Sequence, residues 1–252
     1  MNIEGKTILI TGANRGIGRA LLDEALRRGA KRVYAGTRSG ALQKADERVV
    51  PVKLDVTSAE QINGAVGNVE SLDILINNAG IDLHDDLSDR AGIERHFAVN
   101  LFGTWGVTQA FLPLLARSQG GIVNVLSLAA LASVPFSPAY SISKAAAFSL
   151  TQSLRALWSG RGLTVHAVFS GPVDTDMTQG LNIPKASPGR WRGPSLTEWR
   201  EGTKTSSPIP CQRPSLMAGA AAQPRRSSTS LELLYRRTWR KLREPPQLEV
   251  TK

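Results

Sequence analysis

The sequence predicts an α/β fold, in which a doubly wound, mostly parallel sheet carries helices on both faces. Three observations predict it. Short β-branched runs alternate with segments whose apolar residues recur at spacings of three and four, as in crossover helices packed on a parallel sheet. Valine and isoleucine, which favour buried strands, number 27 in residues 1–188. The 252 residues, 41% of them hydrophobic, are enough to bury a sizeable core.

Six β-branched runs are expected to form the strands, at residues 7–11, 32–37, 49–54, 72–77, 121–127 and 163–169. Helical spacing is clearest in residues 19–29 and 93–115, and a further helix is expected from about Ala139. Ligands of such sheets bind beyond the carboxyl ends of the strands. The loops at those ends are therefore where functional residues are expected.

Composition limits the class of protein. A single cysteine, Cys211, excludes an internal disulfide framework and a multi-cysteine metal site. The opening residues do not resemble a charged leader followed by a long apolar segment, and no window approaches the roughly 18 apolar residues of a membrane span. We expect a soluble, cytoplasmic protein with neither a metal nor a membrane partner.

Three glycines mark the first loop, between the strand at 7–11 and the helix that follows. Gly12 suits a tight turn, Gly16 lets backbone N–H groups approach a pyrophosphate, and Gly18 lets the helix lie close to the sheet. A strand before and a helix after make a phosphate-binding turn the favoured interpretation over a purely structural one.

Further motifs follow in a recognisable order. Thr11-Gly12-xxx-Gly16-x-Gly18, Asn77-Asn78-Ala79-Gly80, Asn100, Ser127 and Tyr140-xxx-Lys144 together resemble the short-chain dehydrogenase/reductase family over roughly residues 3–188. The resemblance implies one Rossmann-type domain, a nicotinamide cofactor and interconversion of a carbonyl and a secondary alcohol. It places cofactor contacts at Thr11, Gly12, Asn14, Arg15, Gly16, Ile17, Gly18, Arg38, Asp55, Val56, Asn78, Ala79, Gly80, Asn100, Tyr140, Lys144, Gly171, Val173 and Thr175.

Two arginines indicate which nicotinamide cofactor is used. In dinucleotide folds an acid about 20 residues beyond the glycines accepts the ribose 2′-hydroxyl, whereas an arginine accommodates a 2′-phosphate. The second strand ends at Arg38 with no carboxylate, and Arg15 lies inside the glycine turn. Because two guanidinium groups suit a dianionic phosphate, we expect NADP. The alternative is that both are ordinary surface charges.

Asp55 follows the third strand, where the family places an acid against the adenine amino group. Asp55 could equally cap a helix that starts near Ala59. The sequence leaves both interpretations open.

The catalytic prediction rests on Tyr140 and Lys144, which are one helical turn apart. A neighbouring ammonium favours a phenolate, so we expect Lys144 to lower the pKa of Tyr140 and to make it a general acid and base. Ser127 is expected to hydrogen bond the substrate oxygen. The resemblance implies that Lys144 also holds the nicotinamide ribose and that Asn100 holds a water linking the lysine to solvent.

The histidines and the loop after the sixth strand carry two further expectations. His84, His96 and His166 lack metal-ligand spacing and are expected to be surface or hydrogen-bonded histidines. Ser170 stands where the family usually has proline, which loosens the predicted contacts of Val173 and Thr175.

The last quarter of the chain departs from the family. Residues 189–252 hold 13 Lys and Arg against 5 Asp and Glu, and only 2 Val and Ile, whereas residues 1–188 hold 18 basic against 16 acidic residues. We expect this basic Pro/Arg/Ser-rich region to lack the family's last strand and to form loop, or one helix over Ser230–Arg243. A shifted reading frame, a basic tail for nucleic acid or an anionic membrane, and an unusual substrate lid are the three explanations.

This departure leaves a second functional hypothesis. The resemblance implies a homo-oligomer and a small-molecule substrate, but the family's substrate cover and oligomer surface would follow Pro188. The first hypothesis is an NADP-dependent oxidoreductase. The second is a protein that binds the cofactor but is catalytically impaired by an aberrant C-terminal region.

Overall fold

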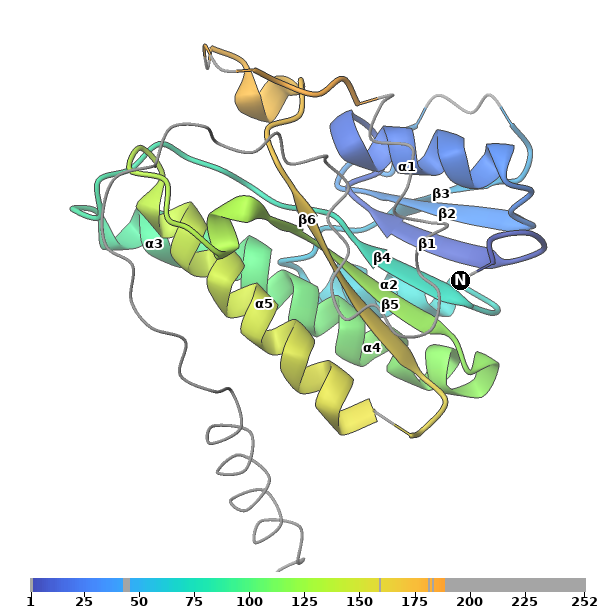
Figure 1. The fold of residues 1–252 in the computed structure, drawn as a ribbon. Coiled ribbons are helices and arrows are strands. Elements are labelled where there is room, and N and C mark those ends of the chain that lie inside the picture. The colour runs from blue at the N-terminus through green and yellow to red at the C-terminus, as the bar shows by residue number, and fades with distance from the viewer. Residues whose placement is uncertain (1, 43–45, 159, 181, 183, 189–252) are drawn as a thin grey trace, which may run out of the picture. The chain divides into compact units, whose positions relative to one another are not determined.

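The computed structural model describes residues 2–42, 46–158, 160–180, 182 and 184–188. Six parallel strands form one sheet in the order β3-β2-β1-β4-β5-β6 (Figure 1). They are β1 (Thr7–Thr11), β2 (Arg32–Thr37), β3 (Val49–Lys53), β4 (Ile74–Asn77), β5 (Gly121–Ser127) and β6 (Thr164–Ser170). The order reverses direction between β1 and β4, where a doubly wound sheet opens its ligand crevice.

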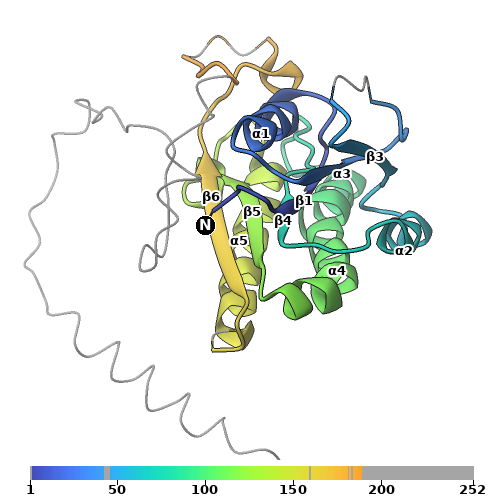
Figure 2. The same cartoon turned by 90° about the vertical axis from the view of Figure 1, so that its right-hand side faces the viewer.

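Helices cover both faces of the sheet, as predicted (Figure 2). On one face α1 (Gly16–Arg27) packs Leu21 and Leu22 against Ile8 and Ile10. On the other face lie α2 (Ala59–Gly67), α4 (Thr104–Ser118) and α5 (Pro138–Trp158). Phe111 of α4 is fully buried there, in a cluster with residues of β1, β4 and β5. Alternate residues of the strands therefore pack on opposite faces of the sheet.

The helix predicted over residues 93–115 differs in one respect. It is built from α3 (Arg90–Phe97), a π-helical turn η1 (Ala98–Gly103) and α4, which follow one another without a break. A π turn holds one residue more than an α turn, and such turns are frequent at functional sites. Two 3₁₀ turns, η2 (Leu128–Ala130) and η3 (Asp176–Thr178), follow β5 and β6.

Several predictions concern residues outside the described ranges. They are the absence of the last strand, the helix at 230–243 and the three explanations for residues 189–252. In the described ranges, no helix is both long enough and apolar enough to cross a membrane. No group of three potential metal ligands occurs among those same residues.

Candidate active site

A cavity of about 970 Å³ lies at the carboxyl ends of the six strands. Of the predicted site residues, it is lined by Gly12, Asn14, Arg15, Gly16, Ile17, Gly18, Arg38, Asp55, Val56, Asn78, Ala79, Gly80, Ser127, Tyr140, Lys144, Gly171, Val173 and Thr175. The fold thus brings together loops that lie far apart in the sequence, from Gly12 to Thr175. Thr11 and Asn100 do not line the cavity, and both are buried behind its wall.

The glycine turn has the geometry that an anion requires. Gly12 and Gly16 have φ values of +67° and +55°, which side chains other than glycine rarely adopt. A Cβ on Gly18 would overlap the carbonyl oxygen of Gly12, so α1 approaches the turn backbone to backbone. Arg15, the N-cap residue, makes no side-chain hydrogen bond to the first turn of α1. The backbone N–H groups of that first turn therefore remain available to a phosphate.

Thr11 fixes the second loop against the first. Its hydroxyl accepts hydrogen bonds from the backbone N–H groups of Asn78 (2.9 Å) and Ala79 (3.0 Å). The Asn78 amide in turn donates to the Thr11 carbonyl at 2.9 Å. Thr11 thereby positions the loop after β4 without itself reaching the cavity.

Two arginines lie in the wall near the glycine turn. Arg15 donates to the Asp176 carboxylate of η3 at 2.7 Å. An acidic side chain is therefore bonded to the arginine that is predicted to bind a phosphate. Arg38 follows β2 and is exposed. Its charge is one of the influences that lower the pKa of Asp55, after the hydrogen bonds from Thr57. Both arginines line the cavity.

The structure tests one of the two interpretations of Asp55, that of a helix cap. Its carboxylate accepts from the backbone N–H of Thr57 at 2.9 Å and from the Thr57 hydroxyl at 2.7 Å. The N-cap of α2 is Ser58, whose hydroxyl accepts from the backbone N–H of Gln61. The interpretation of Asp55 as the helix cap is therefore wrong, because the serine nearer the helix takes that position.

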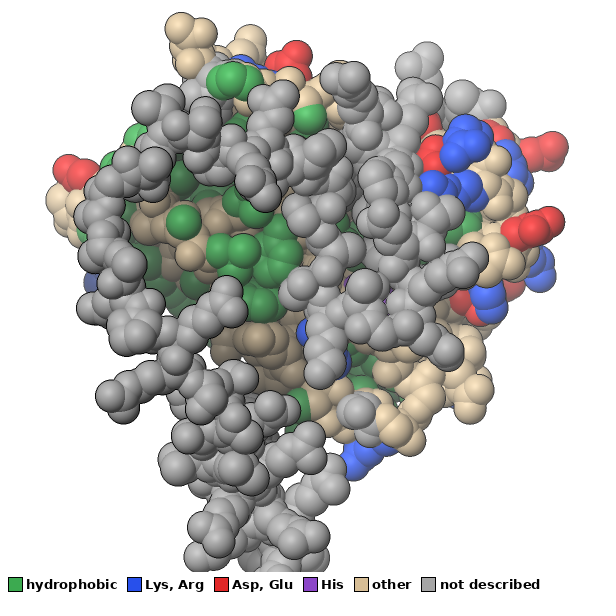
Figure 3. Space-filling model, viewed as in Figure 1, with side chains coloured by type: hydrophobic (Ala, Val, Ile, Leu, Met, Phe, Trp, Pro, Cys, Tyr) green, Lys and Arg blue, Asp and Glu red, His purple; other side chains and the backbone are tan. Residues whose placement is uncertain are grey.

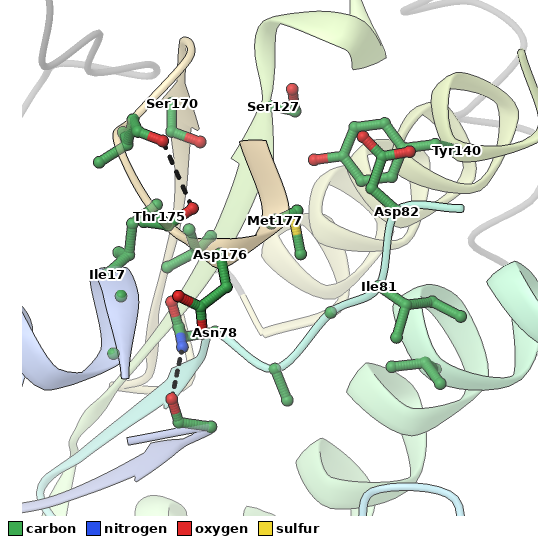
Figure 4. A pocket seen from close by; sticks show the side chains of 18 of the residues that line it. Ile17, Asn78, Ile81, Asp82, Ser127, Tyr140, Ser170, Thr175, Asp176 and Met177 are labelled. Carbon is green, nitrogen blue, oxygen red and sulfur yellow. Dashed lines mark hydrogen bonds between the residues drawn. The ribbon is translucent and has the colours of Figure 1, made fainter. Parts of the chain in front are cut away.

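Ser127, Tyr140 and Asp82 lie together on one side of the cavity, across from Ile17 and Thr175 (Figure 4). Burial raises the pKa of Tyr140 to about 12; interaction with the Ser127 hydroxyl partly offsets this and the charge of Asp82 adds to it. The predicted lowering of this pKa is wrong for the protein alone, because desolvation by burial is the largest influence on the phenol and raises its pKa. Tyr140 is accordingly a protonated phenol at neutral pH.

Lys144 is buried beneath Tyr140. Its Nζ lies 5.8 Å from the centroid of the Tyr140 ring and donates to the Val125 carbonyl at 3.1 Å. In the described part of the chain no other acceptor takes the remaining protons of this ammonium, which lines the cavity. Burial lowers the pKa of Lys144 to about 8, against a smaller raising effect of Asp82. A donor with unused protons fits a ligand with hydroxyl groups, such as a ribose.

Asn100 sits in the π turn η1 and connects three segments. Its amide donates to the Ile81 carbonyl at 3.0 Å and to the Ser143 hydroxyl at 2.9 Å, and its Oδ1 accepts from the Ile81 N–H at 2.9 Å. The side chain thus ties the loop after β4 to the turn of α5 that carries Lys144. The predicted water held by Asn100 stays a prediction.

The loop after β6 closes the cavity. The Ser170 hydroxyl donates to the Leu126 carbonyl at 3.0 Å, so the serine in place of proline adds a bond between β6 and β5. Thr178 donates to the Val173 carbonyl at 2.6 Å, and the Thr175 methyl approaches Gly16. The loop predicted to be loosened is therefore held at both ends.

Sequence reasoning missed part of the cavity wall. Asp82, Leu83, Leu128, Val134, Phe136, Asp176 and Met177 also line the cavity. Hydrophobic side chains gather around a hollow on this face of the molecule (Figure 3). The sequence assigns none of these residues a role. The position of Asp82 two residues after Asn78-Ala79-Gly80 was the one available signal for it.

The three histidines agree with the expectation. His84 is exposed and stacks on Phe136 with ring centroids 5.8 Å apart. His96 is buried: its Nε2 accepts from the backbone N–H of Leu83 at 3.0 Å, and its Nδ1 lies 2.8 Å from the Gly92 carbonyl. Burial and the charge of Arg155 lower the pKa of His166 to about 4.

Several known proteins are similar to most of this chain. The family model for short chain dehydrogenases matches residues 6–186. 2-(S)-hydroxypropyl-CoM dehydrogenase 3 of Xanthobacter autotrophicus is 38% identical over 203 residues, 74% of this chain and 79% of that protein. Oxidoreductase UcpA of Salmonella typhimurium is 34% identical over 193 residues, 71% of this chain and 73% of that protein.

A solved structure agrees with both. The crystal structure of a short chain dehydrogenase from Burkholderia cenocepacia J2315 in complex with NADP is 37% identical. It superposes with a TM-score of 0.76 over 82% of this chain and 89% of that one. This protein therefore belongs to the short-chain dehydrogenase/reductase family and is an oxidoreductase of the carbonyl and alcohol chemistry that the family performs.

Proposed function

We propose that this protein reduces a carbonyl compound to a secondary alcohol with NADPH, and runs the reverse reaction with NADP, in a unit formed by residues 1–188. Bound NADPH would supply the hydride. The remaining chemistry belongs to the chain. The observation that carries the proposal is the placement of Tyr140 and Ser127 in the same cavity as the glycine turn and two arginines.

Tyr140 is the general acid of this proposal. Its raised pKa, about 12, keeps the phenol protonated at neutral pH, so a proton is available for the oxygen of a carbonyl that accepts a hydride. Ser127 hydrogen bonds the same oxygen as negative charge develops there. Lys144 holds ribose hydroxyls with its unused donors, and its charge favours the phenolate that remains after proton transfer. Asn100 acts behind Lys144 by holding its segment.

The cofactor is assigned by the charges at the other end of the cavity. The N–H groups at the start of α1 would hold the pyrophosphate, and Arg15 and Arg38 would hold the 2′-phosphate of NADP. The NADP complex of the Burkholderia protein supports this choice. If it is right, kcat/KM for NADPH exceeds that for NADH by about tenfold or more, a difference of roughly 1.4 kcal/mol.

The test is NADPH oxidation against a panel of aldehydes, ketones and acyl carbonyl compounds. The Tyr140→Phe variant keeps the ring but removes the proton, so turnover should fall at least about 100-fold. Cofactor fluorescence should show that the variant still binds NADPH. Binding of NADPH without turnover of any panel member would instead favour the catalytically impaired alternative.

A further inference from the structure

Asp82 carries a buried acceptor that the chain does not use. The residue follows the loop after β4, is half-buried and lines the cavity. Its Oδ1 is shielded from solvent and has no hydrogen-bond partner among the described residues. Two other side-chain atoms share that condition, Oδ1 of Asn77 and Oγ of Ser137, but neither residue lines the cavity. A buried carboxylate oxygen without a donor is costly, so such a group points to a ligand.

The carboxylate faces the reacting end of the cavity. It is drawn beside the Tyr140 ring in Figure 4, and its charge raises the pKa values of both Tyr140 and Lys144. The ammonium of Lys144 nevertheless donates to the Val125 carbonyl and forms no ion pair with Asp82 within the part of the chain described. The charge of Asp82 is therefore not neutralised by Lys144, although it acts on both Tyr140 and Lys144.

Bonds on both sides keep Asp82 in place. The N–H and carbonyl of Ile81 are bonded to the Asn100 side chain, and the N–H of Leu83 donates to Nε2 of His96. Asn100 and His96 are themselves buried, with 1% and 0% of their surfaces exposed. The loop cannot easily carry the carboxylate away to solvent, which leaves it organised in advance for a donor.

We propose that Asp82 selects substrates that carry a hydrogen-bond donor, a hydroxyl or an ammonium group, on the carbon next to the reacting carbon. The inference rests on the proposed function, because the reacting oxygen is assumed to bind at Tyr140 and Ser127. With the oxygen there, a substituent on the neighbouring carbon lies on the side of Asp82. A carboxylate at that position is rejected by charge repulsion, and an alkyl group leaves Oδ1 without a donor.

The rest of the substrate meets apolar surface. Leu128, Val134, Phe136 and Met177, which line the same cavity, are all apolar. The wall thus suits a molecule with an apolar body and one donor beside the carbonyl. Four phenyl ketones that differ in the group beside the carbonyl test this description. The α-hydroxy and α-amino derivatives of acetophenone carry a donor there, propiophenone carries a methyl group in its place, and phenylglyoxylate carries a carboxylate.

The experiment measures kcat/KM with NADPH for these four ketones. In the unmodified protein the hydroxyl and ammonium ketones should exceed propiophenone by about tenfold or more, as expected for a hydrogen bond to a charged acceptor, and phenylglyoxylate should be slowest. Asp82→Leu should bring the ratios to propiophenone close to one. Asp82→Asn, which keeps the shape, should lose the preference for the ammonium ketone more than that for the hydroxyl ketone.

Asp86→Asn is the matched control, because this exposed carboxylate bonds Ser88 on the same loop and does not line the cavity. Its ratios should equal those of the unmodified protein. Unchanged ratios in both Asp82 variants would overturn the inference. So would a weaker Kd for NADPH with unchanged ratios, which would mean that the donor belongs to the cofactor. No turnover of any of the four also contradicts it, while the wider carbonyl panel separately decides the proposed function.

Discussion

Arg15 and Asp176 form an ion pair at 2.7 Å between the glycine turn and η3. Both side chains are more than half exposed, at 63% and 65%, so the pair contributes little to stability. Its consequence is competition, because the guanidinium that would hold the 2′-phosphate is shared with a carboxylate.

Asp176→Asn should therefore tighten NADPH binding. Removing the competing charge frees Arg15, and because an exposed pair is worth up to about 1 kcal/mol, the Kd for NADPH should fall by up to about fivefold. The Kd for NADH, which lacks the phosphate, should hardly change. Fluorescence titration of both cofactors measures this. Asp23→Asn, which frees Arg19 from a similar pair at 3.0 Å on α1, is the control and should leave the ratio of the two Kd values unaltered.

Gly18→Ala should damage the cofactor end of the cavity. The added Cβ would overlap the Gly12 carbonyl, and because backbone atoms cannot rotate away, α1 or the turn must shift. Overpacking of this kind costs roughly 1–3 kcal/mol, so we expect a lower urea midpoint together with weaker NADPH binding.

Gly64→Ala serves as its counterpart. Gly64 lies in α2, and a Cβ there would meet nothing within 4 Å. Alanine favours a helix by about 0.5–1 kcal/mol over glycine, so this variant should be slightly more stable. Equal effects of the two substitutions would contradict the close approach of α1 to the turn.

Lys144 should make stability rise on the alkaline side. Burial lowers its pKa to about 8 from the ordinary 10.5. Between these two pH values the unfolded chain binds more protons at this group than the folded one, so the free energy of unfolding increases with pH. One group contributes at most about 1.4 kcal/mol per pH unit.

Urea denaturation at a series of pH values from 7 to 10.5 measures the effect. Other groups titrate in this range too, so the informative quantity is the difference between the unmodified protein and Lys144→Met. That difference should grow in favour of the unmodified protein as pH passes 8. A constant difference would contradict the buried position of the ammonium.

Asn124 should be a stability residue. It joins β5 to its neighbours, since its Oδ1 accepts from the Asn77 amide and its Nδ2 donates to Thr151, both at 2.9 Å. Asn124→Leu leaves those buried groups short of partners and should cost about 2 kcal/mol or more in urea denaturation. Ser153→Ala, which removes an exposed hydroxyl bonded within α5 at 3.0 Å, should change stability by less than about 0.5 kcal/mol.

Periodicity predicted the sheet better than the helices. The strands β1, β2 and β5 have the predicted bounds, because β-branched runs end at turn residues. The predicted start of α1 at Arg19 is three residues late, since glycines score as helix breakers while the turn needs them at the helix start. The π turn at Ala98–Gly103 was not predicted, because one inserted residue hardly alters the spacing of apolar residues.

The residues that line the cavity also fall into a predictable and an unpredictable group. Residues in motifs, such as Gly12 and Tyr140, line one cavity because each motif encodes a local backbone shape next to a strand end. Asp82 and Asp176 reach it through loops whose course depends on tertiary bonds, which spacing cannot express. Spacing also placed the charge of Lys144 near Tyr140 correctly but carried no information about desolvation, which governs the pKa.

The π turn limits which insertions and deletions this chain tolerates. Successive residues of an α-helix are rotated by about 100°, so one residue added or removed redirects everything beyond it. In this protein one uninterrupted helical segment must orient Asn100 toward Ile81 and, a few residues later, Val107 and Phe111 toward the sheet. Deleting any one residue between 98 and 103 would restore regular pitch and force a choice between those two orientations. Length, more than side-chain chemistry, is the constrained property of that stretch.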